Sequence, residues 1–165
     1  TSKSGLAMSP KRIVVSTSGV PKMIKKMADD NVKFKLAVSL HSAINETRTS
    51  IMPFNEKMNL DELSNALQYW YAKTKQIITY EYVIWKGVND KMEDINALIK
   101  FCKKAPSKVN LIQYNSIDDP SFVQAPKHVL ENYIQLLGSN KIKATIRRSR
   151  GQDIDAACGQ LANKE

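Results

Sequence analysis

The sequence predicts an α/β fold in which parallel strands are covered by helices on at least one side. Short runs rich in β-branched and aromatic residues alternate along the chain with segments whose apolar residues recur at helical spacing. The strand candidates are nearly continuous apolar runs, which is typical of parallel strands. The chain has 165 residues, enough for one domain with a sizeable core.

Five runs have the composition of strands. In chain order they are residues 12–17, 33–41, 76–85, 108–115 and 142–148. In the second run, period-two alternation places Ser39 and His41 on one side and Leu40 on the other. The third run contains Glu81 among apolar residues, and a carboxylate in a buried strand needs a partner, for example an internal ion pair.

Four segments with helical periodicity lie between the strand candidates. They are residues 21–30, 59–75, 90–104 and 128–140. Three of these segments have start signals: Ser18 and Pro21 for the first, Asn59 and Glu62 for the second, and Asp90 and Glu93 for the third. Gly138 is expected to close the fourth. In the third segment, Cys102 shares the apolar face with Leu98, which predicts a packed core cysteine and not a nucleophile.

Polar residues recur where the predicted strands end. Ser16 lies at the end of the first strand, Ser39 and His41 at the end of the second, and Asn115 at the end of the fourth. The carboxyl ends of parallel strands share one rim of the sheet, where ligand sites gather, so these side chains are expected to converge. A single serine or histidine at a strand end is more often structural, and the prediction therefore rests on the recurrence over three strands.

The charge of the chain favours a polyanionic partner. The formal net charge is +9, and phosphate-rich partners bind basic proteins with release of counterions. Five basic residues gather near the C-terminus: Lys141, Lys143, Arg147, Arg148 and Arg150. Taken alone, such a cluster is more often a solvated strand end than a binding site.

Composition also restricts the compartment. No apolar run is long enough to span a bilayer, and no signal-peptide pattern is present. The chain contains two cysteines, which favours free thiols in a reducing compartment over a disulfide framework. We therefore predict a cytoplasmic protein with no membrane partner.

The predicted strands are too few to close a (β/α) barrel. An eight-stranded barrel typically takes about 250 residues. The chain opens with the polar stretch TSKSGLAMSPKR and contains no metal-binding motif, glycine-rich phosphate loop or catalytic-triad spacing. We expect a parallel-stranded partial (β/α) barrel in which only the later strands are present, as part of a larger protein.

Six segments carry a resemblance to a known family. In chain order they are RIVVSTSGVPKM, KLAVSLHSAINETR, IMPFNEK, YEYVIWKGVND, KVNLIQYN and RRSRGQDIDAACGQLANK. Together they resemble the C-terminal half of the radical S-adenosylmethionine (SAM) RNA methyltransferases. The greatest similarity is to the dual-specificity family that methylates carbon 2 of adenine in 23S rRNA and tRNA. The segment RGQDIDAACGQLA is the most specific part of the resemblance.

The resemblance implies a partial barrel of the radical SAM type that uses SAM and a [4Fe-4S] cluster. The family's cluster ligands form a CxxxCxxC motif that would lie upstream of Thr1, so no metal ligand is expected in this chain. Position by position, the resemblance implies SAM contacts for Ser16, Ser39, Leu40, His41 and Asn115. Cys158 matches the family's methyl-carrying cysteine, within a catalytic C-terminal loop at residues 147–165.

The family's chemistry explains why a cysteine is needed. Carbon 2 of adenine is electron-poor and does not attack the methyl group of SAM directly, whereas a thiolate accepts it readily. A radical formed from a second SAM then activates the S-methyl group, and a base and a second cysteine release the RNA adduct. These two groups would lie upstream of this chain, and the full enzyme also needs an external electron donor. The 165 residues alone are therefore predicted to be inactive.

Two alternatives remain beside this interpretation. The sister family methylates carbon 8 of adenine, although DIDAACGQLA favours carbon 2. A cluster-free RNA-binding module with the same fold would not need Cys158. In both enzyme interpretations, Arg147, Arg148 and Arg150 are expected to hold RNA phosphates beside the Cys158 loop.

Overall fold

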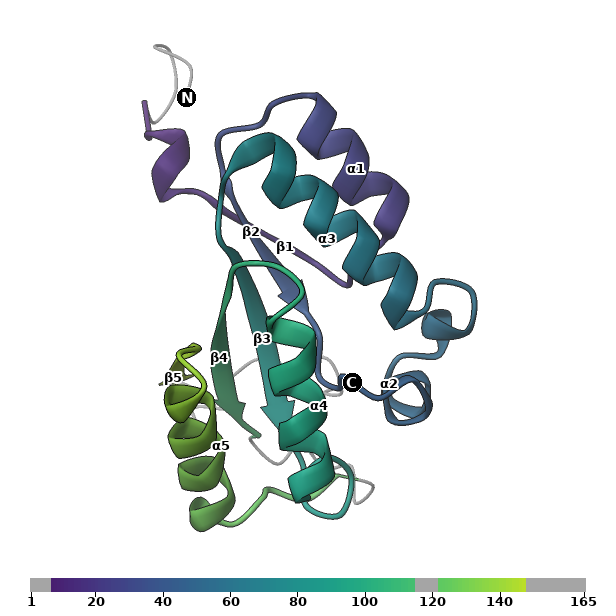
Figure 1. Cartoon of the computed structure of the whole chain (residues 1–165), viewed down its shortest axis with the longest axis vertical. Helices are drawn as coiled ribbons and strands as arrows, with labels where there is room; N and C mark the ends of the chain where they lie inside the picture. The colour runs from purple at the N-terminus through teal and green to yellow at the C-terminus, as the bar shows by residue number, and fades with distance from the viewer. Residues whose placement is uncertain (1–6, 115–121, 148–165) are drawn as a thin grey trace, which may run out of the picture.

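The strands form a single parallel sheet whose order follows the chain (Figure 1). They are β1 (Val14–Thr17), β2 (Lys35–Ser39), β3 (Ile78–Ile84), β4 (Ser107–Gln113) and β5 (Lys143–Arg147). The computed structural model describes residues 7–114 and 122–147. Each neighbouring pair of strands is parallel, which confirms the predicted α/β class.

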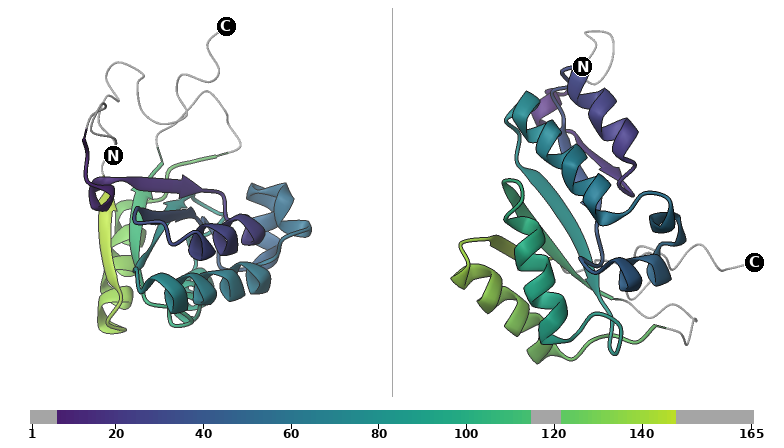
Figure 2. Two further views of the ribbon diagram at one scale, coloured as in Figure 1. Left: turned by 90° about the horizontal axis from the view of Figure 1, so that it is seen from above. Right: turned by 45° about the vertical axis from the view of Figure 1, so that its right-hand side comes forward.

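Four helices cover one face of this sheet (Figure 2). They are α1 (Pro21–Asp29), α3 (Leu60–Thr74), α4 (Met92–Cys102) and α5 (Lys127–Ser139). The periodicity of the sequence does not predict three short elements: η1 (Pro10–Arg12), α2 (Asn45–Ile51) and η2 (Pro53–Glu56). A helix of two turns is too short for a repeating apolar stripe, and α2 buries an arginine in place of apolar residues. In the described part of the chain, no helix has the length and apolarity required to cross a membrane.

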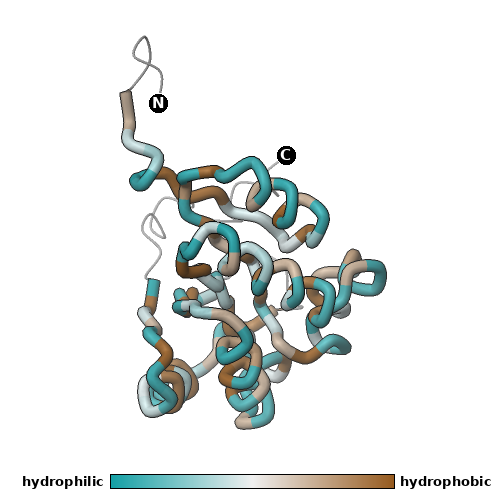
Figure 3. The backbone as a smooth tube through the Cα atoms, turned by 45° about the horizontal axis from the view of Figure 1, so that its top comes forward, coloured by the Kyte–Doolittle hydropathy of each residue, from teal (hydrophilic) through white to brown (hydrophobic). Residues whose placement is uncertain are grey.

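The hydrophobic core lies between the sheet and these helices. It takes every second side chain of the central strands: Leu36, Val38, Leu40, Ile78, Tyr80, Tyr82 and Ile84. Trp70 of α3 is fully buried and stacks near Phe34, with ring centroids 6.5 Å apart. Cys102 is also buried in this cluster, as predicted. Figure 3 shows hydrophobic and hydrophilic residues interleaved along the helices, as expected for helices that pack through one face.

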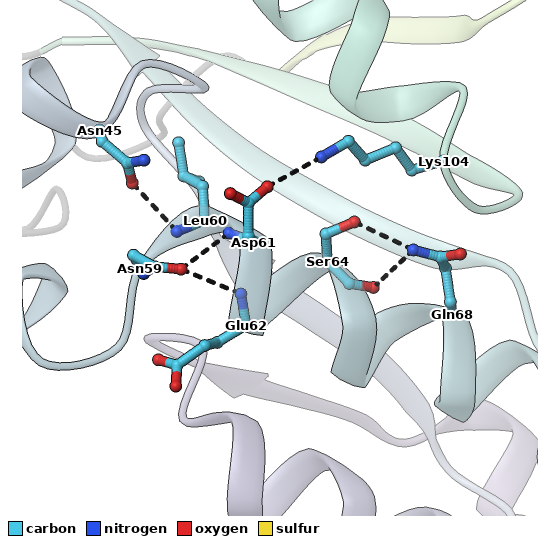
Figure 4. A network of polar contacts seen from close by, with 8 residues as sticks. All are labelled: Asn45, Asn59, Leu60, Asp61, Glu62, Ser64, Gln68 and Lys104. Carbon is cyan, nitrogen blue, oxygen red and sulfur yellow. Dashed lines mark hydrogen bonds and ion pairs between the residues drawn. The ribbon is translucent and has the colours of Figure 1, made fainter.

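The start of α3 is fixed by side-chain caps (Figure 4). Asn59 Oδ1 accepts hydrogen bonds from the backbone N–H groups of Asp61 and Glu62, both at 3.0 Å. Asn45 Oδ1 accepts one from Leu60 N, also at 3.0 Å. These bonds satisfy three of the N–H groups that a helix start leaves without partners, and they confirm Asn59 as the predicted cap.

One predicted helix start is confirmed in the structure, and another is shifted. The residue before α1 is Val20, which makes no side-chain cap, whereas Pro21 does occupy the first helical position. Helix α4 begins at Met92, two residues after Asp90, whose carboxylate accepts a hydrogen bond from Gly87 N at 2.9 Å. The carboxylate at the helix start is that of Asp94, whose Oδ2 accepts from Lys91 N at 3.0 Å. The fixed φ of proline favours a helix start without a cap, whereas Asp90 is already engaged outside the helix.

The end of α5 also differs from the prediction. Gly138 lies inside the last turn of α5, and the residue with left-handed backbone is Lys141, with φ of 61°. The turn closes with hydrogen bonds from Lys141 N to Gly138 O and from Ile142 N to Leu137 O, both at 2.9 Å. These two bonds satisfy carbonyls at the helix end without a glycine at the left-handed position.

Candidate functional site

A row of polar side chains crosses the open face of the sheet, which no helix of the described residues covers. The strand register places Ser39 beside Glu81, Glu81 beside Asn110, and Asn110 beside Thr145. Asn110 Nδ2 donates to Glu81 Oε1 at 2.9 Å, and Thr145 Oγ1 donates to Asn110 Oδ1 at 2.9 Å. Side chains in register point to the same face, so these four residues form one polar row opposite the core.

Glu81 finds partners on this face, as its position in an apolar strand requires. Its side chain is 14% exposed, and its Oε2 lies 4.0 Å from Arg147 Nη1. That distance corresponds to an ion pair and not to a hydrogen bond. Within the described residues, Oε2 is buried without a hydrogen-bond partner. The carboxylate therefore keeps an acceptor oxygen for a further donor.

The sequence interpretation missed Asn110 and Thr145. The signal for Asn110 is its position between Val109 and Leu111, which are both buried in the core. Alternation along the strand therefore turns the Asn110 amide to the other face, toward Glu81. Thr145 in β5 is exposed, and its sequence surroundings give no comparable signal.

His41 lies directly after β2 and is fixed from two sides. Its φ is 57°, its Nδ1 accepts a hydrogen bond from Val83 N at 3.2 Å, and its carbonyl accepts one from Asn89 Nδ2 at 2.7 Å. Burial, and next the charge of Arg48, lower the pKa of His41 from 6.5 to about 4. Because Nδ1 is an acceptor, the neutral ring carries its proton on Nε2 and keeps that N–H as a donor.

The other predicted SAM contacts fall into two groups. Ser16 pairs in register with Ala37, two residues before Ser39 on β2, so both serine side chains face the open side of the sheet. Leu40 differs, because its side chain is fully buried in the core on the helical side. The burial of Leu40 confirms the alternation predicted for this strand, and its side chain does not reach the open face.

Several residues singled out in the sequence lie outside the described part of the chain. These are Asn115, Arg148, Arg150 and Cys158. Arg147, the last described residue, belongs to β5 and is largely exposed beside Glu81.

Arg48 of α2 is a buried cation that the sequence patterns do not single out. Its Nε donates to Leu40 O at 3.2 Å, its Nη2 to Ser18 O at 2.8 Å, and its Nη1 to Asn55 Oδ1 at 2.6 Å. Burial lowers the pKa of Arg48 to about 10, so the guanidinium remains charged at neutral pH. The guanidinium thus contacts the backbone just after β1 and β2, next to the strand-end residues that are predicted to contact SAM.

The groups on the open face suit a nucleoside ligand such as SAM. The hydroxyls of Ser16 and Ser39 both donate and accept hydrogen bonds. A ribose and an adenine edge require this mixture of donors and acceptors. Among the described residues, no group of three or more His, Cys, Asp or Glu side chains could hold a metal ion.

The chain is similar over its whole length to proteins named "Probable dual-specificity RNA methyltransferase RlmN". It is 67% identical over 165 residues to the protein from Flavobacterium psychrophilum, covering 100% of this chain and 48% of that protein. It is 48% identical over 166 residues to the protein from Salinibacter ruber, covering 99% of this chain and 45% of that protein. The chain thus spans about half the length of the curated relatives it matches. No family model matches.

Solved structures agree with these relatives. A radical SAM methyltransferase from Sphaerobacter thermophilus superimposes with a TM-score of 0.92 and 35% identity, over 96% of this chain and 47% of that protein. A domain of a pyruvate-formate lyase-activating enzyme from Bacteroides vulgatus gives a TM-score of 0.61 at 17% identity, which indicates a shared fold alone. The chain is thus a homologue of the C-terminal half of the RlmN dual-specificity RNA methyltransferases, and its fold is that of a radical SAM methyltransferase.

Proposed function

We propose that this chain is the C-terminal half of a radical SAM enzyme that methylates carbon 2 of adenine in 23S rRNA and tRNA, acting in the cytoplasm. The observation that carries the proposal is the 67% identity, over the whole chain, to a protein named as a dual-specificity RNA methyltransferase. The polar open face of the sheet supports it, because that face presents groups suited to a nucleoside.

SAM would be held at the carboxyl rim of the sheet. Ser16 and Ser39 would offer hydroxyls, His41 its Nε2–H, and Asn115 an amide, whereas Leu40 would contribute only main-chain atoms. When bound, SAM and a [4Fe-4S] cluster held by the other half of the enzyme supply the methyl group and the radical chemistry. The residues of this chain bind and orient the ligand against a rigid sheet.

Cys158 would accept the methyl group as a thiolate. The only other cysteine in the chain is Cys102, which is buried in the core. Burial raises the pKa of the Cys102 thiol to about 12, so it stays protonated at neutral pH and is a poor nucleophile. Of the two thiols, Cys158 is therefore the one suited to carry the methyl group.

The RNA would approach over the same rim. Arg147, Arg148 and Arg150 would hold its phosphates while an unstacked adenine reaches Cys158. Reduction of the cluster would require an external electron donor. The 165-residue chain by itself would be inactive, because it contains no cluster ligands.

The test is Cys158→Ala in the full-length protein, with Cys102→Ser as the matched control. Mass spectrometry of 23S rRNA and tRNA nucleosides should detect 2-methyladenosine with the wild type and the Cys102 variant, and none with Cys158→Ala. RNA binding should survive in both variants. Methylation that persists in Cys158→Ala would refute the methyl-carrier role, and 8-methyladenosine as product would assign the chain to the sister reaction.

A further inference from the structure

Arg48 is buried without a carboxylate partner in the described structure. Its side chain is fully buried, and none of the ion pairs of the described residues includes it. A buried charge without a counter-ion is costly, so it persists only where several hydrogen bonds compensate it. A buried charge in a core otherwise made of apolar residues indicates that the guanidinium has a specific structural or functional role.

The guanidinium bridges two neighbouring strand ends. Its Nη2 binds Ser18 O at 2.8 Å, directly after β1, and lies 3.5 Å from Ser39 O at the end of β2. Its Nε binds Leu40 O at 3.2 Å, between Ser39 and His41. A single side chain therefore links the two backbone segments that carry the polar groups of the rim.

The guanidinium itself is held rigidly. Asn55 Oδ1 accepts from Nη1 at 2.6 Å, and Asn55 Nδ2 in turn donates to Thr49 Oγ1 at 2.9 Å. The carbon of the guanidinium lies 5.2 Å from the centroid of the Phe54 ring. A Cβ added to Gly19, whose φ is +104°, would lie 3.3 Å from Nη2, so the chain after β1 passes close to the charge.

We propose that Arg48 is a positioning residue, which holds the carboxyl ends of β1 and β2 at the spacing that SAM binding requires without touching SAM. This inference rests on the proposed function in one respect, namely that SAM is the ligand of the rim. It concerns a residue that none of the sequence patterns assigns to the site.

The chemistry of the side chain explains why an arginine occupies this position. A guanidinium presents five donors in one rigid plane and can satisfy several carbonyls at once. A lysine carries one compact charge and cannot reach Ser18 O, Leu40 O and Asn55 Oδ1 together. Retaining the charge alone, as in Arg48→Lys, should therefore not restore the spacing of the strand ends.

The first measurement is SAM affinity by isothermal titration with the full-length, cluster-containing protein. We expect Arg48→Lys and Arg48→Met to weaken SAM binding by about tenfold or more. Leu137→Ala is the matched control, because Leu137 is fully buried in α5, which precedes β5, and β5 lies at the opposite edge of the sheet from β1. This control loses core packing to a similar degree but should bind SAM like the wild type.

The second measurement needs no SAM. In ¹⁵N-histidine-labelled protein, Nδ1 of His41 accepts from Val83 N, and its resonance should shift in Arg48→Lys but not in Leu137→Ala. The resonance is assigned by its loss in His41→Asn. This readout follows the geometry of the rim and not the stability of the fold.

The outcomes separate the two proposals. Weaker SAM binding together with a shifted His41 resonance in Arg48→Lys supports the positioning role. Wild-type affinity and an unchanged resonance in Arg48→Lys would overturn it. If the wild type itself does not bind SAM, the proposed function fails, and the His41 resonance alone decides whether Arg48 positions the rim.

Discussion

His41 combines a left-handed backbone, a buried ring and a defined tautomer. The N–H of Val83 occupies Nδ1, and the amide of Asn89 holds the carbonyl of His41. The ring is therefore a fixed hydrogen-bond donor at neutral pH, whereas an ordinary histidine at the surface would be partly charged and free to rotate.

The lowered pKa of His41 predicts a pH dependence of stability. Its pKa is about 4 in the folded protein against 6.5 ordinarily, so between these values the unfolded chain binds more protons and unfolding becomes easier as pH falls. His41 should contribute roughly 3 kcal/mol of stability above pH 6.5 that is lost as pH approaches 4. Urea unfolding of wild type and His41→Asn at several pH values isolates this contribution.

His41→Asn is the suitable variant because asparagine tolerates a positive φ and keeps an acceptor for Val83 N. The difference in unfolding free energy between wild type and variant should change with pH only in the window from about 4 to 6.5. A difference that stays constant across this window would contradict the assignment of the buried neutral ring.

The polar row gives a second prediction at the scale of single residues. Asn110→Ala removes the donor to Glu81 Oε1 and leaves a largely buried carboxylate oxygen unpaired, which should cost about 1–3 kcal/mol of unfolding free energy. Thr145→Val is the control, because Thr145 is exposed and water can replace its bond. Equal losses for the two variants would argue against a buried, hydrogen-bonded Glu81.

At the scale of elements, the sequence predicts the long helices and all five strands but not α2. Strands β3 and β4 carry enough apolar residues, and α3 a sufficiently long apolar stripe, to be identified locally. Helix α2 is only seven residues long, and its buried residue is Arg48. The role of Arg48 depends on carbonyls at the ends of two strands, with Ser18 30 residues away and Leu40 eight residues away along the chain. Helical or strand periodicity does not predict such contacts.

The cap of α3 leads to a prediction about this element alone. Asn59→Ala removes the acceptor for two backbone N–H groups and should lower the unfolding free energy by about 1 kcal/mol. Glu62→Gln is the control, because Glu62 bonds to Asn59 through its backbone N–H and should change stability little. Thermal unfolding followed by circular dichroism measures both, and an unaltered midpoint for Asn59→Ala would refute the importance of this cap.

At the scale of the whole molecule, the sequence predicts only part of the candidate site at the carboxyl ends of the strands. Ser16, Ser39, His41 and Asn115 follow from their places at the ends of predicted strands, whereas the role of Cys158 follows only from the family resemblance. The bonds from Asn110 to Glu81 and from Thr145 to Asn110 could not be predicted, because they depend on the register between strands. Alternation along one strand predicts which face of the sheet a side chain is on, but not which residue of the next strand lies beside it.

The basic cluster near the C-terminus predicts how RNA binding responds to salt. Reversing the charges of Arg147, Arg148 and Arg150 in the full-length protein should weaken RNA binding. It should also reduce the slope of log K against log salt by about 2, if each arginine neutralises one phosphate. Filter binding at several salt concentrations provides the measurement.

The matched control reverses Lys22, Lys25 and Lys100, which are exposed on the helical side of the sheet. Both triple variants lower the formal net charge of the chain from +9 by the same amount. If the two weaken RNA binding equally, the effect comes from overall charge and not from a phosphate site beside Cys158. Unchanged affinity of the arginine variant at low salt would exclude the site.

The order of strands in the sheet, β1-β2-β3-β4-β5, also bears on how the protein is made. From β2 onward, each strand pairs with the strand synthesised just before it, so contacts between strands span a single connection along the chain, the longest of which contains α2, η2 and α3. The entropy lost on closing a loop grows only slowly with its length, so each of these connections closes at a similar, moderate cost. Each new strand and its helix can therefore add to the sheet as the chain emerges from the ribosome, so that the sequence of translation is also the sequence of assembly.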